Sequence, residues 1–250
     1  MDKIEILTKI IKEVDIIVFF GGAGVSTESG IPDFRSPSGL YNTKMRVESL
    51  RGTSYTAEEI LSHTFFMQHP NLFFDYYFDA LINPNVVPNF AHIFLTKLEK
   101  KGKLKAIVTQ NIDGLHQMAG SENVIELHGS VKRNYCMKCN QFYNDVELLA
   151  NHAKCPKCGG IIKPDVVLYE EPLNYDDINK AINAISNAEC LIIGGTSLNV
   201  YPAASFIQFF RGKYLIIINR DNTNMDDNAD LVIHEKIGEV FKKANEILKY

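Results

Sequence analysis

The 250-residue sequence contains no apolar run long enough to cross a bilayer. A membrane-spanning helix needs about 20 consecutive apolar residues, whereas the run at residues 16–20 is only Ile-Ile-Val-Phe-Phe. Residues 1–13 mix acidic and basic side chains with isoleucines at helical spacing. They therefore lack the basic start and uninterrupted apolar stretch of a secretory signal. We expect a soluble, cytoplasmic protein with no membrane partner.

The sequence also lacks a strong excess of charge of either sign. Its 26 Lys and Arg nearly balance its 30 Asp and Glu, so the formal net charge is −4. The basic residues form no concentrated stripe of the kind that a nucleic-acid-binding domain usually carries. We therefore predict no direct binding to nucleic acid.

Cysteine is scarce, but four of the five cysteines are paired along the chain. Cys136 and Cys139 form one Cys-x-x-Cys motif, and Cys155 and Cys158 form another after fifteen intervening residues. In a reducing compartment such motifs more often bind metal than form disulfides. Two of them at this spacing predict a zinc ribbon, and since four thiolates fill the tetrahedral shell, the zinc should be structural. The alternative is chance pairing or disulfides; Cys190, in an apolar run, is expected in the core.

Short β-rich runs alternate with helical patterns through most of the chain. This alternation predicts βαβ units in an α/β fold, with a Rossmann-like parallel sheet and helices on both faces. Several predicted strands are apolar at every position, as expected for strands that are covered on both sides. The predicted strands are residues 15–21, 105–109, 124–127, 165–169, 189–194, 214–219 and 230–233. The predicted helices are residues 3–13, 88–101, 176–186, 202–211 and 238–248.

Two stretches interrupt the alternation. Residues 36–87 show no clear strand, but Thr56 and Glu59 form a capping-box pattern at the start of one helix, and the aromatic run 71–82 predicts another. Residues 134–163 are rich in cysteine and poor in apolar runs. We therefore predict a Rossmann-like domain and a smaller helical and zinc-ribbon domain formed by two insertions. The large domain would comprise residues 1–35, 88–133 and 164–250, and the small one residues 36–87 and 134–163.

A glycine-rich turn follows the first predicted strand. Gly22, Ala23 and Gly24 stand where a Rossmann-like sheet binds phosphate, because glycine permits close backbone approach. A dehydrogenase fingerprint would have a third glycine where this chain has Thr27, so that fingerprint fails. Taken alone, the turn could equally be a plain tight turn. The loop that continues it ends in three residues suited to a dinucleotide: Asp33 for an amide or hydroxyl, Phe34 for a ring and Arg35 for pyrophosphate.

Polar clusters follow four other predicted strands. They are Gln110 to His116, His128 to Ser130, Thr196 with Ser197, and Asn219. Ligands of open α/β sheets bind outside the carboxyl ends of the strands, so we expect these clusters to meet in one crevice. His128 is the best candidate for a general base, because it lies just past a strand end and its ordinary pKa is near working pH. His116 is predicted to be structural.

These motifs together resemble the sirtuin family. The resemblance is carried by GAGVSTESGIPDFR at 22–35, TQNIDGLHQMAG at 109–120, ELHGS at 126–130, the four cysteines, GGTSLNVYPAA at 194–204 and Ile-Asn at 218–219. It implies an NAD-dependent protein-lysine deacetylase with its active site in the cleft between a Rossmann-like domain and a helical and zinc-binding domain. The acetyl group of lysine would be transferred to ADP-ribose, nicotinamide would be released, and NAD would be consumed.

The resemblance also implies roles for individual residues. His128 would be the base that activates a ribose hydroxyl, and Asn111 would share the catalytic role by positioning the ribose. The residues that would bind the cofactor are Gly22, Ala23, Gly24, Thr27, Asp33, Phe34, Arg35, Gln110, Asn111, Ile112, Asp113, His128, Thr196, Ser197, Asn219 and Ile237. The acetyl-lysine protein or peptide would add as a strand between Val167 to Tyr169 and the segment at Val200.

The chain departs from the family pattern at Tyr169-Glu170-Glu171, where members often read Phe-Gly-Glu. We hypothesise that Glu170 adds negative charge beside the peptide groove and favours basic residues around the target lysine. Members that favour succinyl- or malonyl-lysine carry a Tyr and an Arg three positions apart, whereas here Tyr41 is followed by Lys44. We therefore predict short neutral acyl groups such as acetyl.

Three other functions compete with this one. An NAD-dependent protein ADP-ribosyltransferase would share the cofactor site, although His128 favours the deacetylase. A nucleic-acid-binding zinc ribbon explains the cysteines but little else, and a dehydrogenase lacks its third glycine. We expect a monomer.

Overall fold

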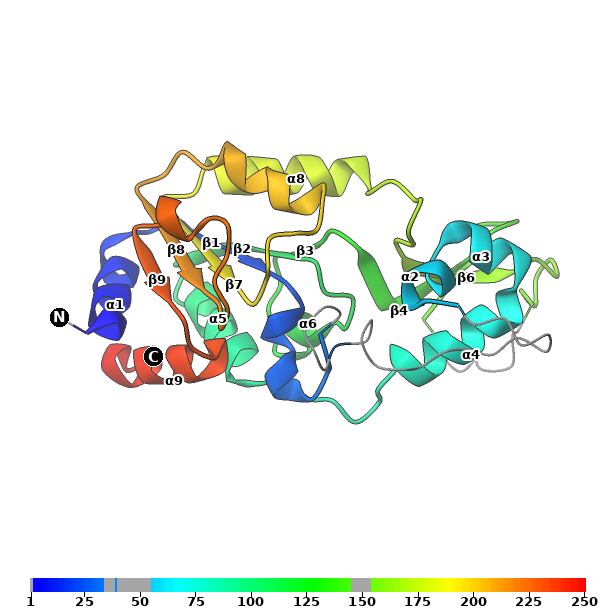
Figure 1. The fold of residues 1–250 in the computed structure, drawn as a ribbon, viewed down its shortest axis with the longest axis horizontal. Helices are drawn as coiled ribbons and strands as arrows, with labels where there is room; N and C mark the ends of the chain where they lie inside the picture. Colours follow the sequence, from blue (N-terminus) through cyan, green and yellow to red (C-terminus); the bar gives the residue numbers. More distant parts are fainter. Residues whose placement is uncertain (1, 34–38, 40–54, 145–153) are drawn as a thin grey trace.

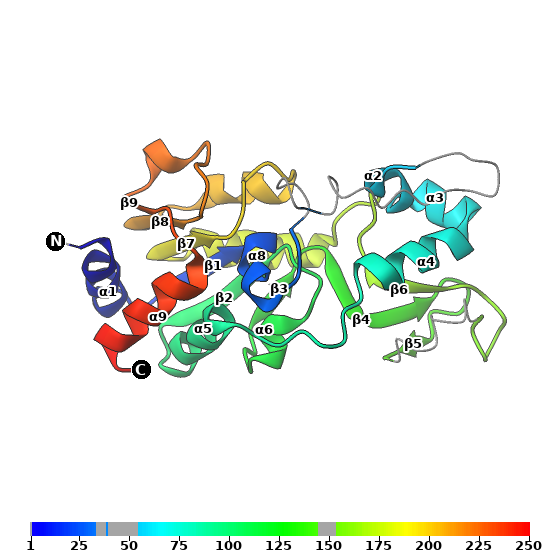
Figure 2. The ribbon, with the colours of Figure 1, turned by 60° about the horizontal axis from the view of Figure 1, so that its bottom comes forward.

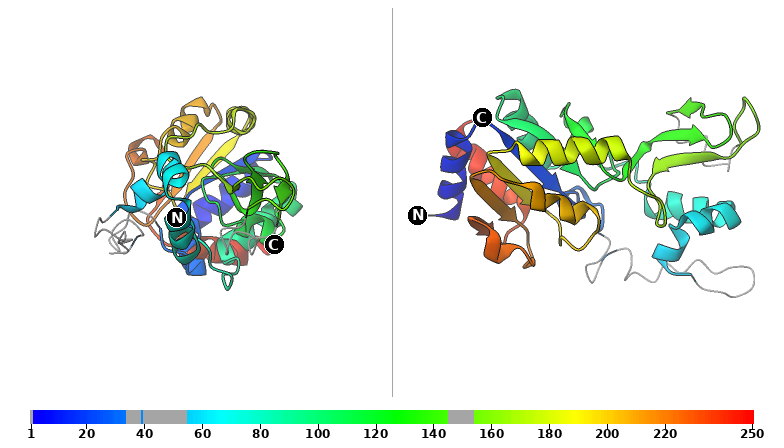
Figure 3. Two further views of the ribbon diagram at one scale, coloured as in Figure 1. Left: turned by 90° about the vertical axis from the view of Figure 1, so that its right-hand side faces the viewer. Right: turned by 90° about the horizontal axis from the view of Figure 1, so that it is seen from above.

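The computed structural model describes residues 2–33, 39, 55–144 and 154–250. The predicted Phe34 and Arg35, and the pair Tyr41 and Lys44, lie outside these residues. The described part divides into a large parallel sheet with its helices and a smaller module beside it (Figure 1). Both chain ends lie at the end of the molecule formed by the large sheet (Figure 3).

The large sheet has six parallel strands in the order β3-β2-β1-β7-β8-β9. The strands are β1 (Ile17–Gly21), β2 (Leu104–Thr109), β3 (Val124–Glu126), β7 (Cys190–Gly194), β8 (Tyr214–Ile218) and β9 (Leu231–Ile233). Every residue of β1 and of β7 is buried, because both faces of the sheet are covered. The Rossmann-like fold that the sequence predicts is confirmed.

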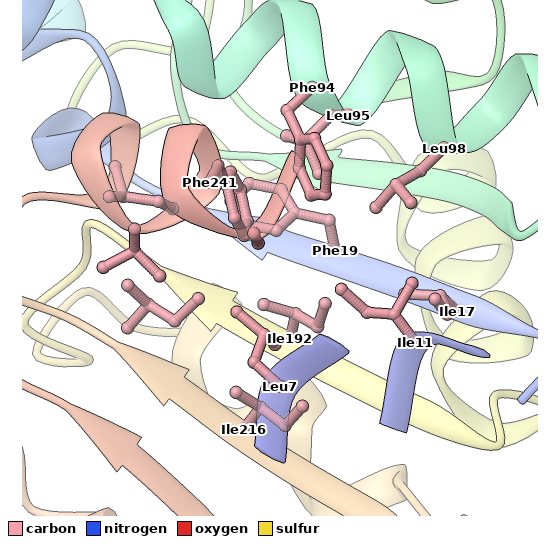
Figure 4. Packing of buried hydrophobic residues seen from close by; sticks show 14 of the residues in the cluster. Leu7, Ile11, Ile17, Phe19, Phe94, Leu95, Leu98, Ile192, Ile216 and Phe241 are labelled. Atoms are coloured by element: carbon pink, nitrogen blue, oxygen red, sulfur yellow. The ribbon is translucent and has the colours of Figure 1, made fainter. Parts of the chain in front are cut away.

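Helices on the two faces bury alternate residues of each strand. Phe19 and Ile192 pack with α1 (Lys3–Glu13), α5 (Phe90–Lys100) and α9 (Ile237–Leu248). Phe19 meets Phe241 edge to face, with ring centroids 6.3 Å apart, and Phe241 lies against Phe94 (Figure 4). Phe20 and Ile193 pack on the opposite face with α8 (Tyr175–Ser186) and the 3₁₀ helix η3 (Ala203–Phe209). The sequence predicted an α-helix at 202–211; the structure has this shorter 3₁₀ helix.

The smaller module joins three short helices to an antiparallel sheet. Its strands, in the order β5-β4-β6, are β5 (Phe142–Tyr143), β4 (Gly129–Cys136) and β6 (Ile162–Val166). The helices are α2 (Ala57–Ile60), α3 (His63–Gln68) and α4 (Pro70–Ala80), and α2 begins with the predicted capping box. Aromatic residues of α3 and α4 pack with Cys136, Cys155 and Val166 in one hydrophobic cluster. Strand β4 leads from the large sheet into this module (Figure 2).

The strand predicted at 165–169 is wrong in extent and in partner. Strand β6 ends at Val166 and pairs antiparallel with β4, a strand that the sequence did not predict. The apolar pair at 166–167 predicts a parallel strand, but Tyr169 forms only an isolated bridge to Ser62. Strand β4 crosses the predicted domain boundary at 133/134, and β6 crosses the one at 163/164. The division into two domains at those boundaries therefore stays a proposal.

The remaining elements are short. They are the 3₁₀ helices η1 (Ala23–Val25), η2 (Thr27–Ser29) and η4 (Asp226–Asn228), and helix α6 (Leu115–Met118). Within the described ranges, no helix has both the length and the apolar character needed to cross a membrane.

Candidate active site

A cavity of about 970 Å³ opens at the carboxyl ends of the central parallel strands and extends to the smaller module. All the predicted site residues that the structure describes, apart from the zinc cysteines, line it. On the cofactor side these are Gly22, Ala23, Gly24, Thr27, Asp33, Gln110, Asn111, Ile112, Asp113, His128, Thr196, Ser197, Asn219 and Ile237. Val167, Tyr169 and Val200 line it as well. The crevice expected from the strand-end clusters is therefore present, while the role of each residue stays a prediction.

The glycine-rich turn packs directly against the end of β7. Gly24 N–H donates to the carbonyl of Gly195 over 2.8 Å, and Gly22 N–H donates to that of Gly194 over 3.2 Å. A Cβ on Gly24 would lie 2.8 Å from the Cα of Gly195, which leaves no room for a side chain. The turn continues into η1 and η2 rather than into a long helix, so the packing does not require a third glycine at Thr27.

A polar network connects this turn to the loop after β2. The Ser26 hydroxyl donates to Asp113 Oδ2 over 2.6 Å and accepts from Asn111 Nδ2 over 3.1 Å. Asp113 Oδ1 also accepts from the backbone N–H of Leu115. Ser26 is buried, and its partners are so remote in sequence that no local pattern predicts its role. The network holds Asn111 and Asp113 in fixed orientations at the cavity wall.

His128 presents one ring nitrogen to a fixed partner. Its Nδ1 lies 2.8 Å from the backbone carbonyl of Gln110. Because a carbonyl can only accept, Nδ1 carries the proton and Nε2 of the neutral ring is left as a proton acceptor. Burial lowers the pKa of His128 from its ordinary value, and the hydrogen bond to Gln110 opposes that effect. The arrangement suits a general base that is neutral near pH 7.

Two further contacts involve segments that line the cavity. Gln110 Nε2 donates to Thr196 Oγ1 over 3.4 Å. Glu28, which the sequence analysis also missed, accepts from Gly238 N–H over 2.7 Å at the start of α9. A carboxylate is favoured at a helix N-terminus, so this bond fixes the glycine-rich loop to α9 beside Ile237.

The segment predicted to bind peptide is already paired along one edge. Tyr169 N–H donates to the Leu61 carbonyl, and the Tyr169 carbonyl accepts from His63 N–H, both over 3.0 Å. Glu170 follows with φ 75°, in the left-handed region that glycine adopts most readily. Its Oε2 accepts from the backbone N–H and the hydroxyl of Thr64. These bonds hold the pKa of Glu170 below its ordinary value, so the carboxylate is ionised.

His116 lies outside the cavity lining and is almost fully buried. Its ring packs 4.7 Å from that of His92 and 6.2 Å from that of Phe19. Burial lowers the pKa of His116 to about 3, so the ring stays neutral. These contacts agree with the structural role predicted for it.

The four cysteines of the two Cys-x-x-Cys motifs form one cluster, with all Sγ atoms within 4.8 Å of one another. The Sγ atoms of Cys136 and Cys158 are 3.4 Å apart, and those of Cys139 and Cys155 are 3.6 Å apart. Zinc bound tetrahedrally by thiolates at about 2.3 Å separates the sulfurs by roughly 3.8 Å. The cluster therefore fits a zinc ion, and four sulfur ligands leave no position for water or substrate.

Comparison with known proteins points to one family. Residues 22–202 match the Sir2 family. An NAD-dependent protein deacetylase of Clostridium perfringens is 60% identical over 97% of this chain and 98% of the relative. A solved structure of Sir2 with a p53 peptide and NAD⁺ is 36% identical and covers 100% of this chain and 99% of that chain, with a TM-score of 0.84. Another, of a Sir2 variant with a deacetylated p53 peptide and 3′-O-acetyl-ADP-ribose, is 36% identical over 98% of both chains, with a TM-score of 0.87.

The chain belongs to the Sir2 family. The resemblance to the sirtuins that the sequence motifs carried is thereby confirmed, and the described cysteine cluster is consistent with the zinc ribbon.

Removal of one zinc ligand should cost the chain its metal. We expect Cys139→Ser to lower the zinc content from about one ion per chain to near zero and to lower the melting temperature, because the metal stabilises a small module. Elemental analysis and thermal unfolding measure both. Cys190→Ala is the matched control: Cys190 is buried in the large-sheet core and should leave zinc unchanged. Full zinc retention by Cys139→Ser would contradict the assignment.

Proposed function

We propose that this chain is an NAD-dependent protein-lysine deacetylase that transfers the acetyl group of lysine to ADP-ribose and releases nicotinamide. The observation that carries the proposal is the environment of His128: a partly buried imidazole with Nδ1 engaged by Gln110, at the wall of a cavity that also holds Asn111 and Asp113. The 60% identity to a named NAD-dependent protein deacetylase supports it.

NAD supplies the ribose that receives the acetyl group. The acetyl oxygen of the modified lysine would displace nicotinamide from the ribose carbon. Nε2 of His128 would then take a proton from a ribose hydroxyl, whose oxygen would attack the acetyl carbon; the lysine nitrogen would leave as the free amine, and water would complete the conversion to O-acetyl-ADP-ribose. Asn111 orients the ribose, and its amide is held by Ser26. The zinc takes no part in this chemistry, since its four ligands are cysteines.

The two ends of NAD would occupy different parts of the cavity. The nicotinamide ribose would lie near Gln110, Asn111, Ile112 and Asp113, which surround the turn after β2. The phosphates would lie on the glycine-rich turn, where glycine permits close approach of the backbone. Thr196, Ser197, Asn219 and Ile237 would contact the adenosine half.

The acetyl-lysine peptide would enter between Val167 to Tyr169 and the segment at Val200. Tyr169 already pairs with the smaller module on one side, so the peptide would lie on the other side, toward the cavity. We further propose that the chain acts as a cytoplasmic monomer and does not bind nucleic acid directly, in line with its small net charge.

Nicotinamide release that depends on acetyl-lysine peptide tests the function. We expect mass spectrometry to detect nicotinamide, deacetylated peptide and O-acetyl-ADP-ribose in equal amounts, and succinyl-lysine peptide to react much more slowly. Succinyl turnover that equals acetyl turnover would contradict the predicted acyl preference. Transfer of ADP-ribose to protein without loss of acetyl would instead support an ADP-ribosyltransferase.

Replacement of the base should slow acetyl transfer. We expect His128→Ala to lower kcat by a factor of about 100 or more, because general-base catalysis typically contributes about 10²–10⁴-fold. In the unaltered chain, burial keeps the pKa of His128 below 6.5. The active neutral ring is therefore lost only as the pH falls below that value, and kcat should decline on the acidic side alone. Full acetyl-lysine turnover by His128→Ala would overturn the assignment.

Glu170 should favour peptides with basic residues beside the acetyl-lysine. The carboxylate is ionised and exposed, so at low salt we expect Glu170→Gln to lower kcat/KM for a basic-flanked peptide about two- to fivefold relative to an acidic-flanked one. Glu58→Gln, an exposed change on α2 away from the cavity lining, is the control. Equal efficiency for both peptides with the unaltered chain would contradict the hypothesis.

A further inference from the structure

Strand β4 contains a three-residue bulge just after His128. Ser130 pairs with Asp165 and Asn134 pairs with Pro164, so residues 131–133 have no partner on β6. The bulge turns one backbone group toward the cavity wall, where Val131 N–H donates to the Ile112 carbonyl over 2.9 Å. Such bulges bend a strand and redirect its side chains.

Arg133, the last residue of the bulge, bridges the large sheet and the smaller module. Its Nη1 lies 2.6 Å from Glu126 Oε2 at the end of β3, and its Nε lies 2.7 Å from Asp165 Oδ2 on β6. The Glu126 side chain is only 8% exposed, whereas that of Asp165 is 37% exposed. A guanidinium is suited to this task, because its rigid array of N–H donors can engage two carboxylates at once.

Both carboxylates belong to the segments that hold His128. Glu126 precedes His128 by two residues on the incoming strand. Asp165 lies two residues before Val167, whose N–H donates to the His128 carbonyl over 3.0 Å. Gly129, at φ 75°, packs so tightly on the same segment that a Cβ would lie 1.9 Å from the Asp165 carbonyl oxygen. The turn that carries His128 is thus enclosed by the two strands that Arg133 joins.

We propose that Arg133 is a positioning residue for His128, acting through its paired contacts with Glu126 and Asp165. It does not line the cavity, so its effect on the reaction would be indirect. The inference rests on the proposed function, because it concerns the base of that reaction. Without Arg133, β3 and β6 lose their side-chain link, and a small shift of the His128 turn would move Nε2 away from the ribose hydroxyl.

The first measurement compares the effect of Arg133→Met on kcat with its effect on the binding of NAD. Displacement of a reacting group by about 1 Å can lower the rate roughly a hundredfold. Arg133→Met should shift the His128 ring by less than that, so we expect kcat to fall about tenfold. The dissociation constant for NAD should stay within about twofold, because the cavity lining is intact. Lys132→Met is the matched control, since Lys132 is an exposed cation of the same bulge with no ion pair among the described residues; it should retain full kcat.

A second variant separates positioning from stability. Arg133→Met leaves the buried Glu126 carboxylate without its partner, which destabilises the fold. Adding Glu126→Gln removes that charge, so the melting temperature should recover while kcat stays low. Asp165→Asn, at the more exposed arm, should lower kcat about threefold with little change in melting temperature. Zinc content and the NMR signals of the His128 ring in the free protein provide readouts that do not depend on turnover.

These outcomes are distinct. Recovery of kcat together with melting temperature in the double variant, or a kcat for Arg133→Met within twofold of the unaltered chain, would overturn the positioning role. Unchanged NMR signals of the His128 ring in Asp165→Asn and in the double variant would also overturn the positioning role. If the unaltered chain releases no nicotinamide from NAD with acetyl-lysine peptide, the proposed function fails instead, whatever the ring signals show.

Discussion

The backbone contact between the glycine-rich turn and the end of β7 fixes the base of the cavity. Gly24 donates to Gly195 over 2.8 Å, and the neighbouring strands β1 and β7 run in parallel register up to this point. Because any side chain on Gly24 would collide with Gly195, the contact exists only between glycine backbones. The turn is thereby held close to the sheet, and Ser26, which follows it, reaches Asp113 and Asn111 in the loop after β2. The polar wall of the cavity depends on this approach.

Partial burial of this polar wall explains its hydrogen bonds and the lowered pKa of His128. A polar group removed from water is costly unless it is hydrogen-bonded, and Ser26, Asn111 and Asp113 satisfy one another. His128 is satisfied at Nδ1 alone, by the Gln110 carbonyl. The same burial that lowers its pKa therefore leaves one unprotonated nitrogen oriented by a backbone bond. The wall combines a hydrogen-bonded network with an imidazole whose Nε2 can accept a proton.

Local patterns predicted the large sheet and the cysteine cluster, because both depend on residues close in sequence. The uninterrupted apolar run of β1, which is buried at every position, and the spacing of the two Cys-x-x-Cys motifs are such patterns. Long-range partners were beyond reach: Ser26 meets Asp113 across 87 positions, and Glu28 meets Gly238 across 210. Strand β4 escaped prediction because its bulge interrupts the alternation of apolar and polar residues. Its partner β6 was consequently assigned to the wrong sheet.

Strand β4 also explains how a zinc ion that takes no part in the chemistry supports the cavity. The strand begins at Gly129, next to His128, and ends at Cys136, a ligand of the cysteine cluster. Because of its bulge, β4 covers only the four steps from Val166 to Ile162 on its partner strand, or roughly 13 Å at about 3.3 Å per residue. That is still too far for the metal to contact the base directly. The metal instead fixes the far end of the strand, where Cys136 and Cys155 pack with the aromatic residues of α3 and α4. The same module supplies Leu61 and Leu168 to the cavity wall, so a zinc-stabilised core holds the second side of a cleft whose first side is the parallel sheet.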